Sequence, residues 1–97
     1  MNELKQQGNK VALVIGAGDA TGGAIAKRFA QGGYISCMTR RNADKLQPLI
    51  QEIEAFGGVA YGFASDARKE KEVIQLIEEI EANIGEIDVL VFNIGAN

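Results

Sequence analysis

The segment Lys10–Gln31, KVALVIGAGDATGGAIAKRFAQ, holds the pattern that decides the fold. It opens with a short apolar run, Lys10–Ile15, of the kind found in a buried strand. A glycine-rich loop follows at residues 16–23, and Ala24–Gln31 has apolar residues four apart, as on one face of a helix. A glycine-rich loop between a strand and a helix is the setting in which backbone amides and a helix N-terminus bind phosphate groups.

The alternation of strand and helix continues along the sequence. Further strands are predicted at Tyr34–Thr39, Val59–Ala64 and Ile87–Phe92, and helices at 42–56 and 69–84. Pro48 lies beyond the first turn of the 42–56 helix, so this helix either kinks or begins its regular part nearer the proline. Alternating elements with short loops indicate a parallel sheet with right-handed crossovers. We therefore predict an α/β fold, a Rossmann-like half with the strand order 3-2-1-4.

Length and composition indicate one domain. The chain has 97 residues, of which 46% are hydrophobic and 24% charged, as in a soluble globular protein. Residues 1–9 are expected to be an N-terminal tail, and residues 10–97 the domain, truncated after its fourth strand. The tail is polar, unlike a signal peptide, and no apolar run is long enough for a membrane span. Cys37 is the only cysteine, so no internal disulfide can form. We expect Cys37 to be a core residue and the protein to be cytoplasmic.

Charge and histidine content narrow the function. Histidine is absent, which excludes Ser-His-Asp triads, Cys-His dyads and histidine metal sites, and no metal site is predicted. The net charge of −3 argues against non-specific nucleic-acid binding. Residues 1–50 carry seven basic and three acidic residues (net +4), whereas residues 51–97 carry three and ten (net −7). An anionic ligand is therefore expected on the first half.

The glycine loop differs from two common phosphate-binding patterns. Thr21 stands where strict G-x-G-x-x-G requires the third glycine, and no Gly-Lys-Ser/Thr follows as in a P-loop. The loop resembles that of the classical short-chain dehydrogenase/reductase family, T-G-x-x-x-G-x-G, followed by a helix of the type R-A-I-A-K-R. Gly16 and Gly22 match the outer glycines, whereas Ile15 and Ala20 replace the threonine and the middle glycine.

Two later features resemble the same family in register. Asp66, which follows the third predicted strand, matches the family aspartate that contacts the adenine amino group, and Ala67 would contact the ring through its backbone. Residues 87–95, IDVLVFNIG, resemble the family pattern I-D-x-L-V-N-N-A-G. Asn93 and Gly95 match the asparagine and glycine that stabilise the central strands and pass close to the cofactor in the family.

Arg40 and Arg41 directly follow the second predicted strand and bear on the choice of cofactor. NAD-preferring relatives carry an acidic residue here for the ribose 2′-hydroxyl, whereas NADP-preferring relatives carry basic residues that suit a 2′-phosphate. The resemblance, which covers Lys10–Asn97, therefore implies a dinucleotide cofactor and favours NADP(H) over NAD(H). The cofactor-binding residues that it implies are Gly16, Gly18, Asp19, Ala20, Thr21, Gly22, Arg40, Arg41, Asp66, Ala67, Asn93 and Gly95.

Each of these residues also has a purely structural alternative. The glycine loop could be a plain strand-to-helix turn, and Arg40 and Arg41 could be solvated charges. Asp66 could cap the following helix, with or without an adenine contact. Asn93 could serve only to satisfy backbone groups between strands. Asp19 is expected to face solvent, since close to a phosphate its charge would repel.

The residues that carry the family's chemistry are missing from this sequence. The family uses a serine and a Y-x-x-x-K pair, in which the tyrosine moves a proton as hydride is transferred. Tyr34 and Tyr61 are followed four residues later by Met38 and Ser65. We predict that the chain binds cofactor without catalysing, and that a longer parent transfers hydride between NADP(H) and a carbonyl or alcohol substrate. The alternative is a non-catalytic module, from a truncated or shortened paralogue, that binds a nucleotide or a partner.

The fourth predicted strand bears on association. Residues 87–92 end in the apolar sequence VLVF, which would form an open edge of the sheet. We expect self-association through this edge, or its coverage by another segment.

Overall fold

The computed structural model describes residues 10–94, so the predicted tail and residues 95–97, Gly95 among them, lie outside the described part. These residues form a four-stranded sheet in the order β3-β2-β1-β4, with every pair parallel. The strands are β1 Val11–Ile15, β2 Ile35–Arg40, β3 Val59–Ala64 and β4 Ile87–Phe92. The helices are α2 Ala20–Gln31, the short 3-10 helix η1 Ala43–Leu46, α3 Gln47–Ala55 and α4 Glu70–Asn83. The predicted α/β fold and strand order are confirmed.

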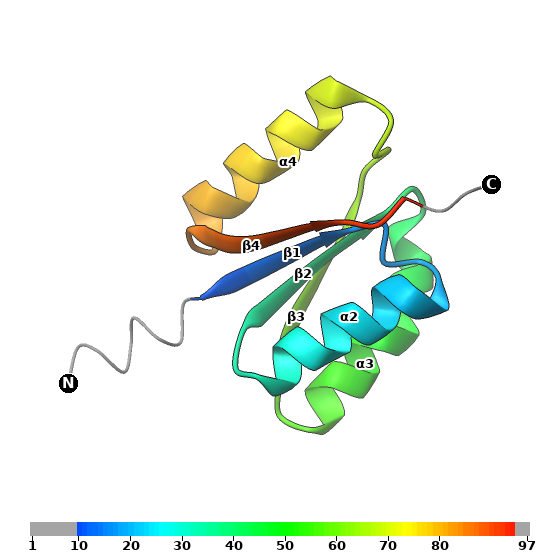
Figure 1. Ribbon diagram of the computed structural model, residues 1–97, viewed down its shortest axis with the longest axis vertical. Coiled ribbons are helices and arrows are strands. Elements are labelled where there is room, and N and C mark those ends of the chain that lie inside the picture. The colour runs from blue at the N-terminus through cyan, green and yellow to red at the C-terminus, as the bar shows by residue number, and fades with distance from the viewer. Residues whose placement is uncertain (1–9, 95–97) are drawn as a thin grey trace.

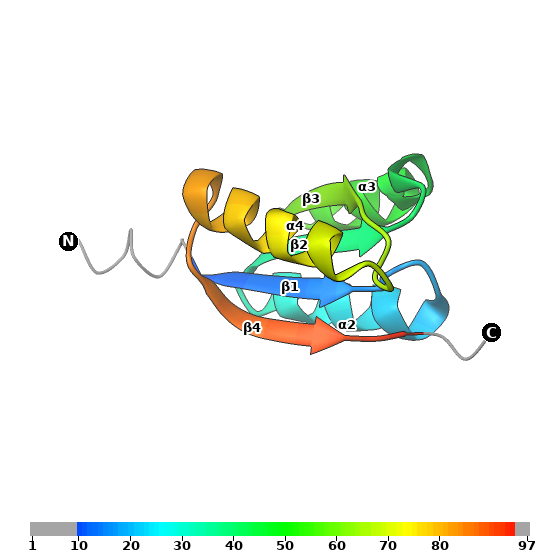
Figure 2. The same cartoon turned by 90° about the horizontal axis from the view of Figure 1, so that it is seen from above.

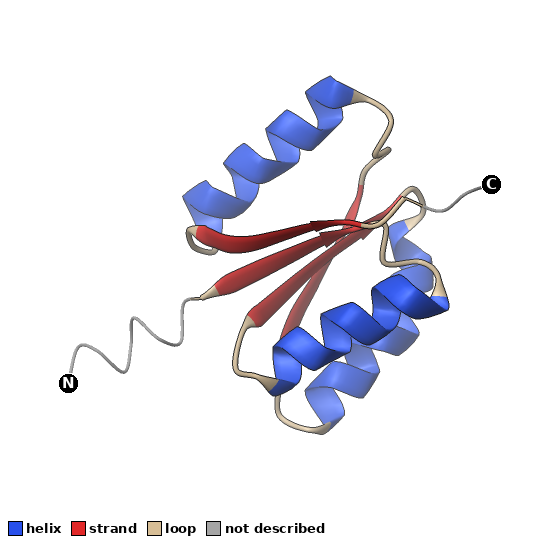
Figure 3. Cartoon of the chain, in the orientation of Figure 1, coloured by secondary structure: helices blue, strands red, loops and turns tan. Residues whose placement is uncertain are grey.

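Helices cover both faces of the sheet (Figure 1). Helices α2 and α3 lie on one face and α4 lies on the other, as the view from above and the colouring by element type also show (Figure 2, Figure 3). All five residues of β1 are buried, because this strand lies between β2 and β4 and beneath helices on both sides. No helix within residues 10–94 combines the length and the apolar character needed to cross a membrane.

The two faces of the sheet have separate cores. On the α4 face, Leu13 packs with Leu76 and Ile80 of the helix. On the opposite face, Val14 packs in a cluster that includes Ile53 of α3. On the α4 side, Val73, Ile77 and Ile84 pack partly buried against the Leu13 cluster, because the buried face of a helix is wider than a single row of residues.

Cys37 lies in β2 and is completely buried in the core on the α4 face. Burial raises the pKa of its thiol to about 12. The thiol therefore stays protonated at physiological pH and is a poor nucleophile. The prediction that Cys37 is a core residue is confirmed.

Helix α2 begins at Ala20, so the prediction of a loop reaching residue 23 is wrong. Asp19 is the N-cap, and its carboxylate accepts a hydrogen bond of 2.7 Å from the backbone N–H of Gly22. This cap draws the next residues into the first helical turn. The helix ends as predicted, with Gly32 at the C-cap and Gly33 in the left-handed region at φ 94°.

The region around Pro48 contains two helical pieces. Asn42 caps the 3-10 helix η1 by accepting a hydrogen bond of 3.1 Å from the N–H of Asp44. The α-helix α3 then begins at Gln47, which places Pro48 in its first turn, where the missing N–H breaks no helical bond. Of the two alternatives, the one in which the regular helix begins near the proline is confirmed.

The edge strands leave large apolar side chains exposed. The small residues of β3 pack against the α3 side, where Ala60 is 8% exposed, whereas Tyr61 on the other face is 44% exposed. At the other edge, Leu90 and Phe92 of β4 are 51% and 56% exposed. The open apolar edge is therefore observed, and self-association through it stays a prediction.

Candidate functional site

The carboxyl ends of the strands surround a cleft of about 560 Å³. The chain segments after β1, β2, β3 and β4 all contribute to it, because parallel strands end at the same edge of the sheet. The predicted site residues that line the cleft are Gly16, Gly18, Asp19, Arg40, Arg41, Asp66, Ala67 and Asn93. Ala20, Thr21 and Gly22 lie in the first turn of α2 beside it, and Gly95 falls outside the described residues.

Gly16 connects the end of β1 to the glycine loop. Its φ of 88° lies in the left-handed region, and a β-carbon there would overlap the carbonyl oxygen of Asn93. Its N–H donates to both the carbonyl oxygen and the hydroxyl of Thr39, each at 3.2 Å. Only glycine can adopt this backbone conformation without a clash. Its contacts with Thr39 and Asn93 hold the start of the loop against the ends of both strands that neighbour β1, which are β2 and β4.

Asn93 joins the end of β4 to the same loop. Its side-chain amide donates to the carbonyl oxygen of Gly16 at 2.9 Å and to the carboxylate of Asp19 at 3.1 Å. Its backbone N–H donates to the carbonyl oxygen of Ile15 at 2.8 Å. Asn93 therefore satisfies backbone groups of the neighbouring strand and loop, which is the structural role considered for it. The same hydrogen bonds orient the groups that face the cleft.

The N-terminus of α2 presents both amides and a carboxylate. Asp19 is exposed, as expected, but its carboxylate already accepts hydrogen bonds from Gly22 and Asn93. Within residues 10–94, no protein group accepts a hydrogen bond from the backbone N–H of Ala20 or Thr21. These two amides can bind an anion, although the charge of Asp19 opposes it.

Basic side chains gather beyond the end of β2. A β-carbon added to Gly18 would lie 3.0 Å from Cζ of Arg40, so the glycine leaves room for this guanidinium beside the loop. Arg41 is exposed, and both arginines and Lys45 of η1 line the cleft. The sequence reasoning missed Lys45, although it follows Arg41 by four residues, the spacing of one helical turn.

Asp66 is held by its neighbour Arg68. The Asp66 carboxylate accepts hydrogen bonds from the Arg68 Nε at 3.2 Å and from the Arg68 backbone N–H at 3.0 Å, and these hold the pKa of Asp66 below its ordinary value. The N-cap position of α4 is occupied by Lys69, and no side-chain hydrogen bond caps the helix at that position. The Asp66 carboxylate does not cap α4. The capping alternative is therefore wrong. The backbone N–H of Asp66 donates instead to Glu72 at 2.8 Å.

The comparisons with known proteins identify the family. A model of the family described as short chain dehydrogenase matches residues 10–97. The chain belongs to the short chain dehydrogenase family. Sorbitol-6-phosphate 2-dehydrogenase from Escherichia coli (strain K12) is 36% identical to it over 89 residues, which are 90% of this chain and 34% of that protein.

Solved structures of short chain dehydrogenases share the fold. A short-chain dehydrogenase from Rhodopseudomonas palustris has a TM-score of 0.87 and 45% identity, over 92% of this chain and 42% of the other. A metagenomic short-chain oxidoreductase in complex with NADP has a TM-score of 0.86 and 34% identity, over 91% and 40%. The chain thus spans about a third of the length of the first curated relative and about two fifths of these solved chains.

Some residues that line this cleft of the short chain dehydrogenase were not predicted from the sequence. Besides Lys45, Arg68 and Ser65 line the cleft, as does Thr39, which was predicted only as the last residue of the second strand. Arg68 stands two residues after Asp66, a spacing at which an aspartate commonly bonds to the following backbone. For Thr39 and Ser65 the only signal was their place at the carboxyl ends of strands.

Proposed function

We propose that this chain is the NADP(H)-binding part of a short-chain oxidoreductase. The proposal is carried by one observation: Arg40, Arg41 and Lys45 line the same cleft as the glycine loop. A 2′-phosphate brings two negative charges, for which paired guanidinium groups are well suited. NAD-preferring relatives carry an acidic residue for the ribose at the end of the second strand. This chain carries Arg40 and Arg41 there instead.

The residues present fit a dinucleotide. The cleft volume of about 560 Å³ lies in the range of small-molecule sites. The free N–H groups of Ala20 and Thr21 would hold the pyrophosphate at the N-terminus of α2. Ala20, which replaces the family's middle glycine, lies in the first turn of α2 beside the cleft and not in its lining. Asp66 and Ala67 line the same cleft and would contact the adenine end.

Bound NADP(H) would supply the hydride, and the protein residues described above would bind and orient it. The sequence has no Y-x-x-x-K pair, so we propose that the 97-residue chain transfers no hydride itself. A longer parent would transfer hydride between NADP(H) and a carbonyl or alcohol substrate. The cytoplasmic location expected for it stays a prediction.

The test is a calorimetric titration of the chain with NADPH and with NADH at low salt. We expect NADPH to bind about tenfold or more tightly than NADH, because a charge-assisted contact to the 2′-phosphate is lost in NADH. Arg40→Ala should remove most of this preference. Arg28→Ala is the matched control, because Arg28 is an exposed arginine in the last turn of α2 and does not line the cleft.

Two results would contradict the proposal. One is equal affinity for the two cofactors in the unaltered chain, and the other is an equal effect of Arg28→Ala and Arg40→Ala. Absence of binding by a chain with a cooperative thermal transition would favour the second candidate function, a non-catalytic partner-binding module. The exposed apolar residues Leu90 and Phe92 on β4 favour that candidate, with a second copy as the partner.

A further inference from the structure

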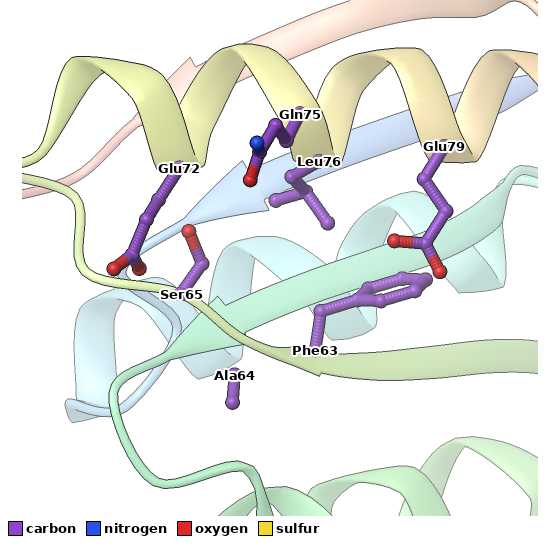
Figure 4. A pocket seen from close by; sticks show the side chains of 7 residues that line it. All are labelled: Phe63, Ala64, Ser65, Glu72, Gln75, Leu76 and Glu79. Carbon is purple, nitrogen blue, oxygen red and sulfur yellow. The ribbon is translucent and has the colours of Figure 1, made fainter.

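A second hollow, of about 310 Å³, lies between the end of β3 and one side of α4 (Figure 4). Glu72, Gln75 and Glu79 line it from the helix, where their spacing places them on the same side. Phe63 and Ser65 line it from the strand side. Ser65 is the only lining residue that it shares with the dinucleotide cleft, so the two hollows are largely separate.

Ser65 places an unused polar group at one end of this hollow. The residue is only 7% exposed, and its hydroxyl has no hydrogen-bond partner within residues 10–94. Figure 4 shows the hydroxyl directed from the strand toward α4, close to the side of Glu72. A buried hydroxyl without a partner is unfavourable, and such groups are rare in folded proteins. The Ser65 hydroxyl is therefore free to accept a hydrogen bond from a ligand at this end of the hollow, or to donate one.

The two acids of the hollow have little compensating charge. Within residues 10–94, Glu79 has no ion-pair partner. Glu72 Oε1 accepts the hydrogen bond from the Asp66 backbone N–H, and the cation nearest to its Oε2 is Lys69, whose Nζ lies 3.9 Å away, with both side chains well exposed. An anionic ligand is therefore excluded here. No group of three or more metal-ligating side chains was found in the described part of the chain, which argues against a metal ion.

The lining changes in character along the hollow. Figure 4 shows the Glu72 carboxylate beside Ser65 at one end, the Glu79 carboxylate above the Phe63 ring at the other, and Gln75 and Leu76 between them. Leu76 is 5% exposed and provides the apolar part of this middle region. The two acids are seven positions apart, which corresponds to roughly 10 Å along the axis of a helix.

We propose that this hollow binds a linear aliphatic diamine, with one ammonium group at each end. One ammonium group donates to Oε2 of Glu72 and to the Ser65 hydroxyl, replacing Lys69, while Oε1 keeps its hydrogen bond from Asp66. The other pairs with Glu79 above the ring of Phe63, where a cation is also attracted to the aromatic face. A chain of about five methylene groups covers Leu76 and places each ammonium group within hydrogen-bond reach of the acid at its end of the hollow. The site does not depend on the dinucleotide proposal.

The test is a titration of the ¹⁵N-labelled 97-residue chain with 1,5-diaminopentane at low salt, followed by amide chemical shifts. We expect saturable shifts centred on Ser65, Gln75 and Glu79. n-Pentylamine, which has the same chain and one ammonium group, should bind about tenfold more weakly. Glu79→Gln should weaken diamine binding about tenfold. Glu78→Gln, which removes the same charge from an exposed neighbour outside the hollow, should leave binding unchanged.

Several outcomes would overturn the proposal. These are the absence of saturable shifts, equal binding of n-pentylamine, and an equal effect of Glu78→Gln and Glu79→Gln, which would indicate a diffuse attraction to the acidic helix. Ser65→Ala should keep the thermal midpoint of the free chain, since it removes an unpaired buried hydroxyl, and should weaken the diamine. Unchanged diamine binding by Ser65→Ala would overturn the assignment of that hydroxyl to the site.

Discussion

Asn93 donates its side-chain amide to the carboxylate of Asp19 at 3.1 Å, and so connects the end of β4 to the N-terminus of α2. These two residues are far apart in the sequence, yet together they determine the charge and shape of the loop. The carboxylate occupies the position from which a helix N-terminus attracts anions. Asp19 thus stabilises the free loop while opposing the ligand that the loop is proposed to bind.

The first prediction concerns this opposition. Asp19→Asn should keep the cap, because asparagine caps helices about as well as aspartate, and should remove the negative charge. We expect NADPH to bind about threefold to tenfold more tightly, with a change in unfolding free energy below about 1 kcal/mol. Calorimetry and urea unfolding measure the two effects.

Asp44→Asn is the control for Asp19→Asn, because Asp44 is an exposed acid in the first turn of η1 and does not line the cleft. Weaker NADPH binding by Asp19→Asn would contradict the expected repulsion. It would instead assign the Asp19 carboxylate a favourable contact with the cofactor.

The second prediction separates two effects at Gly16. Gly16→Ala should lower the free energy of unfolding by more than about 3 kcal/mol, because a left-handed backbone and a clash with Asn93 act together. Gly33→Ala is the matched control, since its φ of 94° is equally unfavourable but a β-carbon there would meet no atom within 4 Å. This variant should lose only about 1 to 2 kcal/mol in urea unfolding. Similar losses in both variants would show that the contact with Asn93 is unimportant.

The third prediction concerns the pH dependence of stability. Hydrogen bonds from Arg68 lower the pKa of Asp66 in the folded state, so the ionised carboxylate contributes stability above its unfolded pKa. This contribution is lost as the pH falls through the folded pKa. Arg68→Ala should therefore be less stable than the unaltered chain near pH 7, and the difference should shrink below about pH 4. Urea unfolding of both proteins at a series of pH values, from about pH 7 to below about pH 4, measures this difference.

The control for Arg68→Ala is Arg28→Ala, because Arg28 forms no ion pair within the described part of the chain. A stability difference for Arg68→Ala that stays constant down to the lowest pH would mean that Arg68 stabilises by packing rather than through Asp66.

The fourth prediction concerns the open edge at β4. Phe92 is 56% exposed on this strand, and a lysine placed on an edge strand opposes pairing with another strand. We expect the unaltered chain to associate as its concentration rises, and Phe92→Lys to stay monomeric. Sedimentation velocity over a dilution series measures this. Tyr61→Lys alters the other edge strand, β3, and should leave association unchanged. Loss of association only in Tyr61→Lys would place the interface at β3 instead.

The predictions from sequence succeeded where one local pattern determined the outcome. The continuous apolar run of β1 and the strand–helix alternation suffice for the fold, because a strand buried on both faces must be apolar throughout. The start of α2 was missed, because Asp19 was not recognised as an N-cap. Lys45 was missed because the sequence does not show that η1 turns back toward the end of β2.

The sequence alone determined the order of elements, the glycine at position 16 and the basic pair at residues 40 and 41, because strand burial, backbone dihedral freedom and charge are properties of single residues or short runs. Only the tertiary structure decided which partners these residues meet. It bonded Asn93 to Gly16 and to Asp19, and it left the Ser65 hydroxyl without a partner within residues 10–94. Such contacts depend on distances between segments that the chain brings together only on folding.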